Sequence, residues 1–584
     1  MQSIIGRLKH ILAEAVRSTL PIEEVPVITP GTSKTPGYFV SPVALSIFNR
    51  YKKEGCFGYS NAFQLANTIS QHLPASDIVE RIEVAQNGFM NIFIQNAFVI
   101  NTLTGLVRTN SVEVNLQSTP CKILVDFSSP NIAKEMHVGH LRSTIIGDAI
   151  CKCLEYLGHD VLRVNHLGDW GTQFGMLLCY LLEEYPDWES NPPDISNLEA
   201  FYKAAKKRFD SDEDFKTRSR LKVVDLQSGN EEAVKIWKFI CKVSRDYLQI
   251  IYDRLGITIQ DCGESFYNSM LPGLVEELRE QGYITESDGA LIFPLSGHTV
   301  PLMAQKSDGG YGYDSTDLAA AKHRLLTLGA KRVIYVTDVG QAPHFYMIFD
   351  AAKLVGWHRP PETRMDHAGF GVVLGPDGKK FKTRTGEAIK LSDLLDEAKS
   401  RALQQLTKRS EDQGMGQTTH LDQEQFEEAA ELMGTAAIKY YDLRQNRIST
   451  YAFAFDKMLD PRGNTAVYLI YAYARICSIL TKAGSEAVER GVNSELQITT
   501  PHERALALLL CRFPDILETV VDELALNKVC DLLYEISVKY SEFYNACKVI
   551  DSPEQDSRLQ LCLATKLMMF KLFHLLGIKP LEKI

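Results

Sequence analysis

The strongest constraint on the fold of this chain is a strand–turn–helix segment between residues 123 and 158. The apolar run Ile123-Leu124-Val125 has β-strand character, and apolar residues then recur at helical spacing from Leu141 to Leu157. Gly158 is suited to end that helix. The turn between strand and helix contains the tetrapeptide HVGH, residues 137–140.

The residue types of this turn indicate an anion site. Gly139 has no Cβ, so another group can approach its backbone closely. A helix start offers free N–H groups and a positive dipole end. His137 and His140, three residues apart, can donate further hydrogen bonds to phosphate oxygens. This pattern predicts a site for a nucleoside triphosphate without a Walker-type loop. The alternative is a turn that carries two surface histidines, since the motif is only four residues long.

Bulk properties indicate a multidomain globular protein. The 584 residues are 45% hydrophobic and 23% charged, which is ordinary for such proteins. A net charge of −10 does not by itself indicate nucleic-acid binding, although a local basic face is enough to steer an RNA.

The twelve cysteines form no CxxC pair and show neither zinc spacing nor a disulfide framework. We therefore expect reduced, mostly buried thiols and no bound zinc. No apolar run is long enough to cross a membrane. The first 20 residues form an amphipathic helix that could be an organelle-targeting peptide, but Glu14 and the apolar spacing favour a packed helix. These features predict a cytoplasmic protein with no membrane partner.

Four regions follow from the pattern along the chain. Residues 1–115 have the pattern of a small α+β domain. Strands and helices alternate over residues 116–390, which predicts an α/β domain with a parallel sheet, interrupted by an insertion of charged helices near 185–262. Residues 391–425 are expected to be a connecting segment and polar linker, and residues 426–584 a helical bundle.

More motifs fall in the second region. NHLGDWG (165–171) follows a predicted strand, and GES (263–265) follows another. KSDGG (306–310) leads to Tyr313 and Asp317, and if Asp317 starts a helix, Tyr313 lies just before it, near the same opening. GKKFKTR (378–384) forms a cationic loop that could neutralise phosphate charge. Each motif alone is more often a turn or a solvated charge run.

In combination, the motifs resemble those of the arginyl-tRNA synthetases, a family of class I aminoacyl-tRNA synthetases. The segments that carry this resemblance are SSPNIAKEMHVGHLRST, NHLGDWGTQFG, GESFYN, KSDGGYGYDSTDLAA, GQAPHF, KKFKTRTG and GNTAVYLIYAYAR. The resemblance covers nearly the whole chain. It implies a Rossmann-like catalytic domain with insertions, an N-terminal module that touches the corner of the tRNA, and an all-α anticodon-binding bundle.

The resemblance also implies roles for individual residues. Asn131 and Gln341 would hold the α-amino group of arginine, and Glu264, Tyr313 and Asp317 would receive its guanidinium. A guanidinium is a planar fork of donors that stays charged, so carboxylates suit it as acceptors. ATP would be bound by residues of the turn and of the cationic loop: His137, Gly139, His140, Lys380 and Arg384.

The cationic loop departs from the pattern of the class, which usually is KMSKS. Here it is KFKTR, so the second lysine position is Thr383. The resemblance suggests Lys134 as a substitute for the missing lysine, and Lys380 and Lys382 remain alternatives.

Contacts with tRNA are expected at both ends of the chain. Phe89 and Asn91 lie in QNGFMN (86–91), which could contact an unstacked base or could be an ordinary turn into a strand. Helices that contain Arg447, Tyr468, Tyr471 and Arg475 are expected to approach the anticodon, although tyrosines at helical spacing are more often core residues.

With this resemblance, the sequence predicts an arginine–tRNA ligase, expected to be monomeric, that uses L-arginine, ATP with Mg²⁺ and tRNA(Arg). The resemblance also implies that the activation step needs bound tRNA. One alternative is a catalytically silent synthetase-like protein that binds RNA or proteins, suggested by the altered loop. A second is an HxGH enzyme that adenylylates a small cofactor, which the helical C-terminal third and the acidic pocket disfavour.

Overall fold

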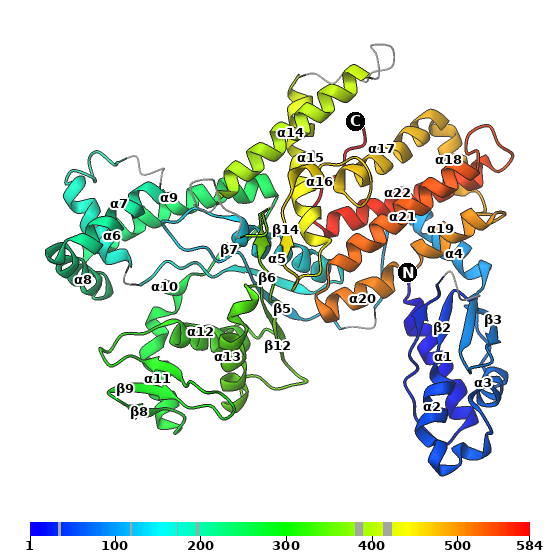
Figure 1. Ribbon diagram of the computed structural model, residues 1–584, viewed down its shortest axis with the longest axis horizontal. Coiled ribbons are helices and arrows are strands. Elements are labelled where there is room, and N and C mark those ends of the chain that lie inside the picture. The colour runs from blue at the N-terminus through cyan, green and yellow to red at the C-terminus, as the bar shows by residue number, and fades with distance from the viewer. Residues whose placement is uncertain are drawn as a thin grey trace.

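The computed structural model describes residues 1–32, 37–116, 119–171, 173–193, 198–375, 377–379, 389–412 and 423–583. Figure 1 shows an N-terminal domain, a central α/β domain with peripheral insertions, and a C-terminal helical bundle. The N-terminal domain hangs beside the bundle, on the side away from helices α6–α8 of the first insertion.

The N-terminal domain is a four-stranded antiparallel sheet with helices, in the strand order β1-β2-β4-β3. Its elements are α1 (Ile4–Thr19), β1 (Thr29–Pro30), β2 (Phe39–Ser41), α2 (Val43–Tyr51), α3 (Ala62–Gln71), β3 (Val79–Val84), β4 (Met90–Ile94) and α4 (Asn96–Thr109). The predicted packed first helix is confirmed, because Ile4, Leu8, Leu12, Ala15 and Val16 of α1 are buried. Its N-cap, Ser3, donates a 2.7 Å hydrogen bond to Asp515 of the bundle, so this domain and the C-terminal third are in contact.

The predicted parallel sheet is also confirmed. Five strands lie in the order β12-β11-β5-β6-β7, and all neighbours pair in parallel. They are β5 (Lys122–Asp126), β6 (Asp160–Asn165), β7 (Gln260–Asp261), β11 (Arg332–Tyr335) and β12 (Arg364–His367). The strand order reverses between β5 and β11. Ligands of such sheets bind outside the carboxyl ends of the strands at that point.

Two helices follow the strands at this point. Helix α5 (Val138–Tyr156) follows β5, and α13 (Ala342–Leu354) follows β11 after the short 3₁₀ turn η5 (Val339–Gln341). Gly147 of α5 lies against the Phe127 ring so closely that a Cβ there would be 2.2 Å from it. This contact fixes α5 over the end of β5.

The sheet is interrupted by two insertions, of which the sequence predicted one. The first contains charged helices, as expected: α6 (Gln173–Glu184), α7 (Leu198–Ser211), α8 (Glu213–Gln227) and α9 (Glu231–Leu255). The second is an antiparallel sheet of β8 (Thr285–Ser287), β9 (Ala290–Phe293) and β10 (Leu302–Gln305). Asp288 and Gly289 both have positive φ and join β8 to β9, so an Asp-Gly hairpin signal was present.

Helices α10 (Glu264–Tyr267), α11 (Leu271–Glu280) and α12 (Tyr313–Lys322) flank this second sheet, and a π-helical turn, η4 (His323–Thr327), follows α12. Asp317 does not start a helix. Helix α12 begins at Tyr313, after the N-cap Gly312, and Asp317 lies in its second turn.

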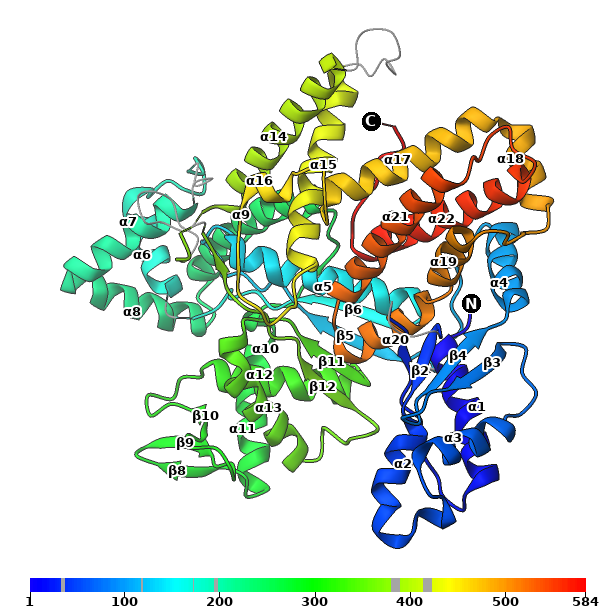
Figure 2. The same cartoon turned by 45° about the vertical axis from the view of Figure 1, so that its right-hand side comes forward.

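The segment expected to connect the sheet domain to the bundle contains a long helix in the structure. Helix α14 (Leu391–Asp412) packs against α15 (Gln423–Leu443). Figures 1 and 2 show this pair projecting from the body. Gly434 permits the close approach, because a Cβ there would lie 2.8 Å from the Ala398 backbone. Residues 413–422 of the predicted linker lie outside the described part of the chain.

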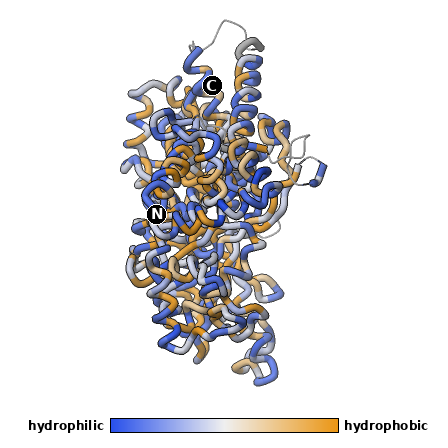
Figure 3. Tube along the Cα trace, turned by 90° about the vertical axis from the view of Figure 1, so that its left-hand side faces the viewer, coloured by the Kyte–Doolittle hydropathy of each residue, from blue (hydrophilic) through white to orange (hydrophobic). Residues whose placement is uncertain are grey.

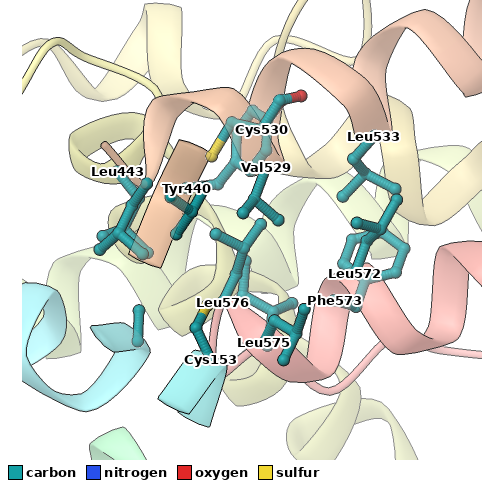
Figure 4. Close-up of a cluster of buried hydrophobic side chains, with 14 of the residues drawn as sticks. Cys153, Tyr440, Leu443, Val529, Cys530, Leu533, Leu572, Phe573, Leu575 and Leu576 are labelled. Carbon is teal, nitrogen blue, oxygen red and sulfur yellow. The ribbon is translucent and has the colours of Figure 1, made fainter. Parts of the chain in front are cut away.

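The C-terminal third is helical, as predicted, and packs directly on the helix that follows the HVGH turn. Its helices are α17 (Ala466–Ala483), α18 (Ser485–Asn493), α19 (Pro501–Leu510), α20 (Phe513–Glu523), α21 (Asn527–Ala546) and α22 (Gln555–Leu575), preceded by α16 (Phe455–Met458). Figure 4 shows Cys153 of α5 among side chains of α15, α21 and α22. Helix α5, which begins at the HVGH turn, is therefore packed against the bundle.

The hydropathy pattern agrees with a folded globular chain. In Figure 3, hydrophobic and hydrophilic stretches alternate along the trace. Among the helices of the described ranges, none is long and apolar enough to cross a membrane. All twelve cysteines are free in the structure, and all except Cys121 and Cys262 are buried, which confirms the prediction that most of the thiols are buried.

Candidate active site

The HVGH turn presents two imidazoles in a defined orientation. His137 is the N-cap of α5, and its Nδ1 accepts the Gly139 N–H at 3.1 Å. The Nδ1 of His140 accepts the His137 N–H at 3.1 Å. Because both Nδ1 atoms accept, each neutral ring carries its proton on Nε2, as a donor. The two ring centroids lie 4.0 Å apart.

The protonation of both histidines favours this neutral form. Desolvation lowers the pKa of His137. Burial, with the neighbouring His137 and Lys134, lowers the pKa of His140 to about 3. Two neutral Nε2–H donors at a helix N-terminus, with a lysine within electrostatic reach, form a site that suits phosphate oxygens.

The loop between β5 and this turn is held in a strained conformation. Ser128, Ser129 and Ala133 have φ angles of 68°, 47° and 62°, in the left-handed region that non-glycine residues seldom adopt. Hydrogen bonds hold each one: the backbone N–H groups donate to Ser143 Oγ (2.8 Å), Asn165 Oδ1 (3.0 Å) and Ser244 Oγ (3.1 Å), respectively. Strain that the surroundings sustain in this way is typical of a preorganised functional loop.

Backbone contacts place the NHLGDWG and GES motifs beside this loop. Asn131 forms a parallel bridge with Gly168, where a Cβ would lie 2.1 Å from Asn131 Oδ1. The Glu264 N–H donates to the Leu167 carbonyl at 3.0 Å. A Cβ on Gly263 would meet the Asp169 carboxylate at 2.5 Å, so glycine is needed for this approach.

The acidic residues meet at the same opening. Glu264 begins α10, and Asp317 lies on α12. Burial, with repulsion from Asp317 and Asp169, raises the pKa of Glu264 to about 7. Asp317 accepts from His344 Nε2 at 2.7 Å, and His166 Nε2 lies 3.9 Å from its other oxygen. Burial alone would raise the pKa of Asp317, but these histidines outweigh it and the pKa is lowered. The pocket therefore favours a cation.

A buried ion pair supports this pocket from the sheet side. Arg324 is fully buried and lies 2.7 Å from Asp126, the last residue of β5. Its other nitrogen lies 3.2 Å from His166 Nδ1. The pair links the end of β5 to His166 and so fixes the ring that faces Asp317.

The remaining predicted residues lie around the rim or outside the described residues. Tyr313 is 75% exposed and lies one helical turn before Asp317, on the same face of α12. Gln341 is exposed in η5, at the carboxyl end of β11. Lys134 is exposed, with its Nζ 5.2 Å from the centre of the Tyr202 ring of α7. Lys380, Lys382, Thr383 and Arg384 fall outside the described residues.

Comparison with known proteins agrees with this geometry. A family model described as "tRNA synthetases class I (R), catalytic domain" matches residues 103–455. An "Arginyl tRNA synthetase N terminal domain" matches residues 5–94, and a "DALR anticodon binding domain" matches residues 469–584. The chain belongs to the arginyl-tRNA synthetase family. It is thus a class I aminoacyl-tRNA synthetase, a ligase with ATP as a substrate.

Individual relatives of this family are similar over the whole chain. "Arginine--tRNA ligase, cytoplasmic" from Homo sapiens is 42% identical, over 100% of this chain and 89% of the relative. The enzyme of the same name from Mus musculus is 43% identical, with the same coverage. The solved arginyl-tRNA synthetase of Plasmodium falciparum is 35% identical and superposes with a TM-score of 0.90 over both whole chains. That of Thermus thermophilus (22%, TM-score 0.79, both chains fully covered) shares the fold.

Two residues expected to contact tRNA differ from their predicted settings. Phe89 is half-buried, and Asn91 is only 5% exposed, with its amide donating to the Glu83 carbonyl at 3.2 Å. Asn91 lies within β4, where its side chain completes strand pairing and does not face solvent. In this segment the side chain of Phe89 is therefore partly accessible to a tRNA, whereas that of Asn91 is not.

Arg447 also differs from its predicted setting, since it is not in a helix. Helix α15 ends at Leu443, and Arg447 lies in the following loop. Its guanidinium donates to the Gly369 carbonyl, and its own carbonyl accepts from Arg142 at 3.3 Å. Arg142 in turn pairs with Asp442 at 2.9 Å, and both are buried. This loop joins α5 to the bundle.

The sequence interpretation missed several residues of the pocket. His344, Asp314 and His166 lie within or beside the quoted motifs, yet no role was assigned to them. A signal existed for Asp314, since it lies three residues before Asp317 and hence on the same helical face. No signal in the sequence places His344 between them, because it belongs to another helix.

Proposed function

We propose that this chain charges tRNA(Arg) with L-arginine, through an arginyl-adenylate made from ATP. The observation that carries this proposal is the pocket of Glu264 and Asp317 beside the HVGH turn, at the point where the strand order reverses. A site for a permanent cation next to a site for phosphates is what arginine activation requires. The relatives named arginine–tRNA ligases support the same reaction.

Arginine would be held at both of its ends. Glu264, Asp317 and Tyr313 receive the guanidinium, because a planar fork of donors matches carboxylate oxygens. Asn131 and Gln341, at the carboxyl ends of β5 and β11, hold the α-amino group. A neutral side chain would leave the Glu264 carboxylate without a cation, and this cost disfavours it.

Activation would then depend on positioning and on neutralised phosphate charge. The Nε2–H donors of His137 and His140, with the backbone at Gly139, bind ATP phosphates, and Lys380 and Arg384 add charge from the cationic loop. The arginine carboxylate attacks the α-phosphate and displaces pyrophosphate, with Mg²⁺ accompanying ATP. The 3′-terminal hydroxyl of the tRNA then takes the arginyl group.

The other domains supply the tRNA contacts. The N-terminal domain approaches the corner of the tRNA, and the helices that carry Tyr468, Tyr471 and Arg475 approach the anticodon. We further propose that the protein is a monomer. We also propose that it acts in the cytoplasm, which is the location that the names of the relatives give for those proteins.

ATP–pyrophosphate exchange, measured with each of the twenty amino acids and with or without tRNA, tests the proposal. Exchange with arginine alone among the amino acids, and only when tRNA is present, is the expected result. A silent synthetase-like protein would show no exchange under any condition. A cofactor-adenylylating enzyme would show exchange only when its cofactor acceptor is added, whether or not arginine and tRNA are present.

Phe89→Ala is expected to raise the Michaelis constant for tRNA about fivefold or more. The basis is that stacking of a base on an aromatic ring contributes about 1–3 kcal/mol. The Michaelis constant for arginine is expected to stay unchanged, because Phe89 lies in the N-terminal domain. The control is Phe57→Ala, which removes an exposed aromatic ring elsewhere in this domain. If the Michaelis constant for tRNA is the same in both variants and in wild type, Phe89 has a structural role only.

A further inference from the structure

His344 lies between two carboxylates of the arginine pocket. Its Nε2 is 2.7 Å from Asp317 Oδ2, and its Nδ1 is 3.3 Å from Asp314 Oδ1. Asp314 is itself fixed, because its second oxygen accepts the Met303 N–H of β10 at 2.7 Å. The ring of His344 therefore sets the orientation of the Asp317 carboxylate, through contacts that reach from α13 to α12 and β10.

The same contacts favour a positive charge on His344 when the pocket holds no substrate. Burial alone would lower the pKa of His344, but the hydrogen bonds to Asp314 and Asp317 outweigh it and raise the pKa to about 9. The other titratable groups around this pair are His166, Glu264 and Arg324, which act on Asp317 or share its opening. At neutral pH the imidazolium thus offsets one of the two negative charges on Asp314 and Asp317.

A guanidinium that binds Asp317 brings a second positive charge beside the His344 imidazolium. Two cations at this separation repel each other, and the repulsion is strong where water is excluded. Arginine cannot lose its charge, whereas the imidazolium can. The Nδ1 proton is the one to leave, because its contact with Asp314 is the longer one and Nε2–H still donates to Asp317.

We propose that arginine displaces a proton from His344 when it binds. This inference rests on the proposed function. The protonated ring occupies the place of the guanidinium charge in the empty pocket, and the proton passes to solvent as the substrate enters. His344 is a positioning residue, since the neutral ring continues to orient Asp317. The empty pocket binds one more proton than the filled pocket, so arginine affinity rises with pH, by up to about tenfold per pH unit, and levels off near pH 9.

Titration calorimetry of the full-length enzyme with arginine, in the presence of tRNA, tests this linkage. Two buffers of different ionisation enthalpy at pH 8.3 give the number of protons released. At this pH Glu264, with a pKa of about 7, is already ionised, and His344 is still mostly protonated. Wild type is expected to release about 0.8 proton more than His344→Gln, which keeps a donor to Asp317 but cannot titrate. Subtracting the proton release of His344→Gln from that of wild type also removes the contribution of the arginine α-amino group, which is the same in both.

Asp314→Asn provides a second test that a purely structural role would not pass. It retains the bond between His344 and Asp317 but removes one of the charges that raise the histidine pKa. The pH at which proton release is half-maximal is expected to fall. Equal proton release by wild type and His344→Gln, or an unshifted profile in Asp314→Asn, would overturn the inference while arginine still bound. Absence of any arginine binding would instead overturn the proposed function, and the inference with it.

Discussion

Asp317→Asn is expected to weaken arginine binding by about 2–5 kcal/mol, the usual cost of removing one partner from a desolvated charge pair. This corresponds to a dissociation constant roughly thirtyfold to several thousandfold higher. The side chain of Asp317 is only 18% exposed, and His166 and His344 surround it, so water cannot replace the lost charge effectively. ATP affinity is expected to change little, because the phosphates bind at the HVGH turn.

The measurement is the dissociation constant of each ligand, supported by the Michaelis constants in aminoacylation. Asp350→Asn is the matched control, because it removes an exposed carboxylate from the neighbouring helix α13. If the dissociation constant for arginine is unchanged in Asp317→Asn, Asp317 does not recognise the guanidinium, and Glu264 remains as its acceptor. An equal loss of ATP affinity would indicate a folding defect instead.

The sequence predicts the frame of this site because the frame rests on local patterns. An apolar strand, a glycine-containing turn and a helical repeat specify β5, the HVGH turn and α5 without reference to the rest of the chain. Parallel pairing follows from the alternation of elements. The tautomers of His137 and His140 do not follow, because they depend on which backbone N–H groups the rings accept.

The acidic pocket, in contrast, does not follow from local sequence patterns. Glu264 and Asp317 belong to helices on different segments, and only the tertiary fold brings them to one opening. His344 was missed for the same reason. Its sequence position after Gln341 indicates a helix, but its role arises from two carboxylates on α12.

Two helix starts have local causes that the sequence interpretation did not use. Leu391, Leu394, Leu395, Ala398 and Ala402 repeat at helical spacing, and in the structure they are buried in α14 against α15. Helix α12 begins after Gly312, whose N–H donates to Ser315 Oγ at 3.4 Å, so Asp317 lies in the second turn.

Lys134→Ala is expected to slow adenylate formation roughly 10²–10³-fold, the range for removing one preorganised donor from developing charge. Negative charge grows on the α-phosphate and on departing pyrophosphate, and Thr383 supplies no cation at the usual position. Lys134 lies close enough to His137 and His140 to lower the pKa of both rings. Its Nζ is also near the Tyr202 ring, a contact that restricts the side chain on the rim of the phosphate site.

Pre-steady-state measurement of pyrophosphate release, with tRNA present, decides this role. Arginine affinity is expected to change less than the rate. The control is Lys238→Ala, an exposed lysine on α9 of the same domain. Thr383→Lys is expected to leave the wild-type rate nearly unaltered and to rescue Lys134→Ala in part, because a lysine there restores the cation that the signature loop lacks. Release at the wild-type rate in Lys134→Ala would exclude this residue from the step and transfer its role to Lys380 or Lys382.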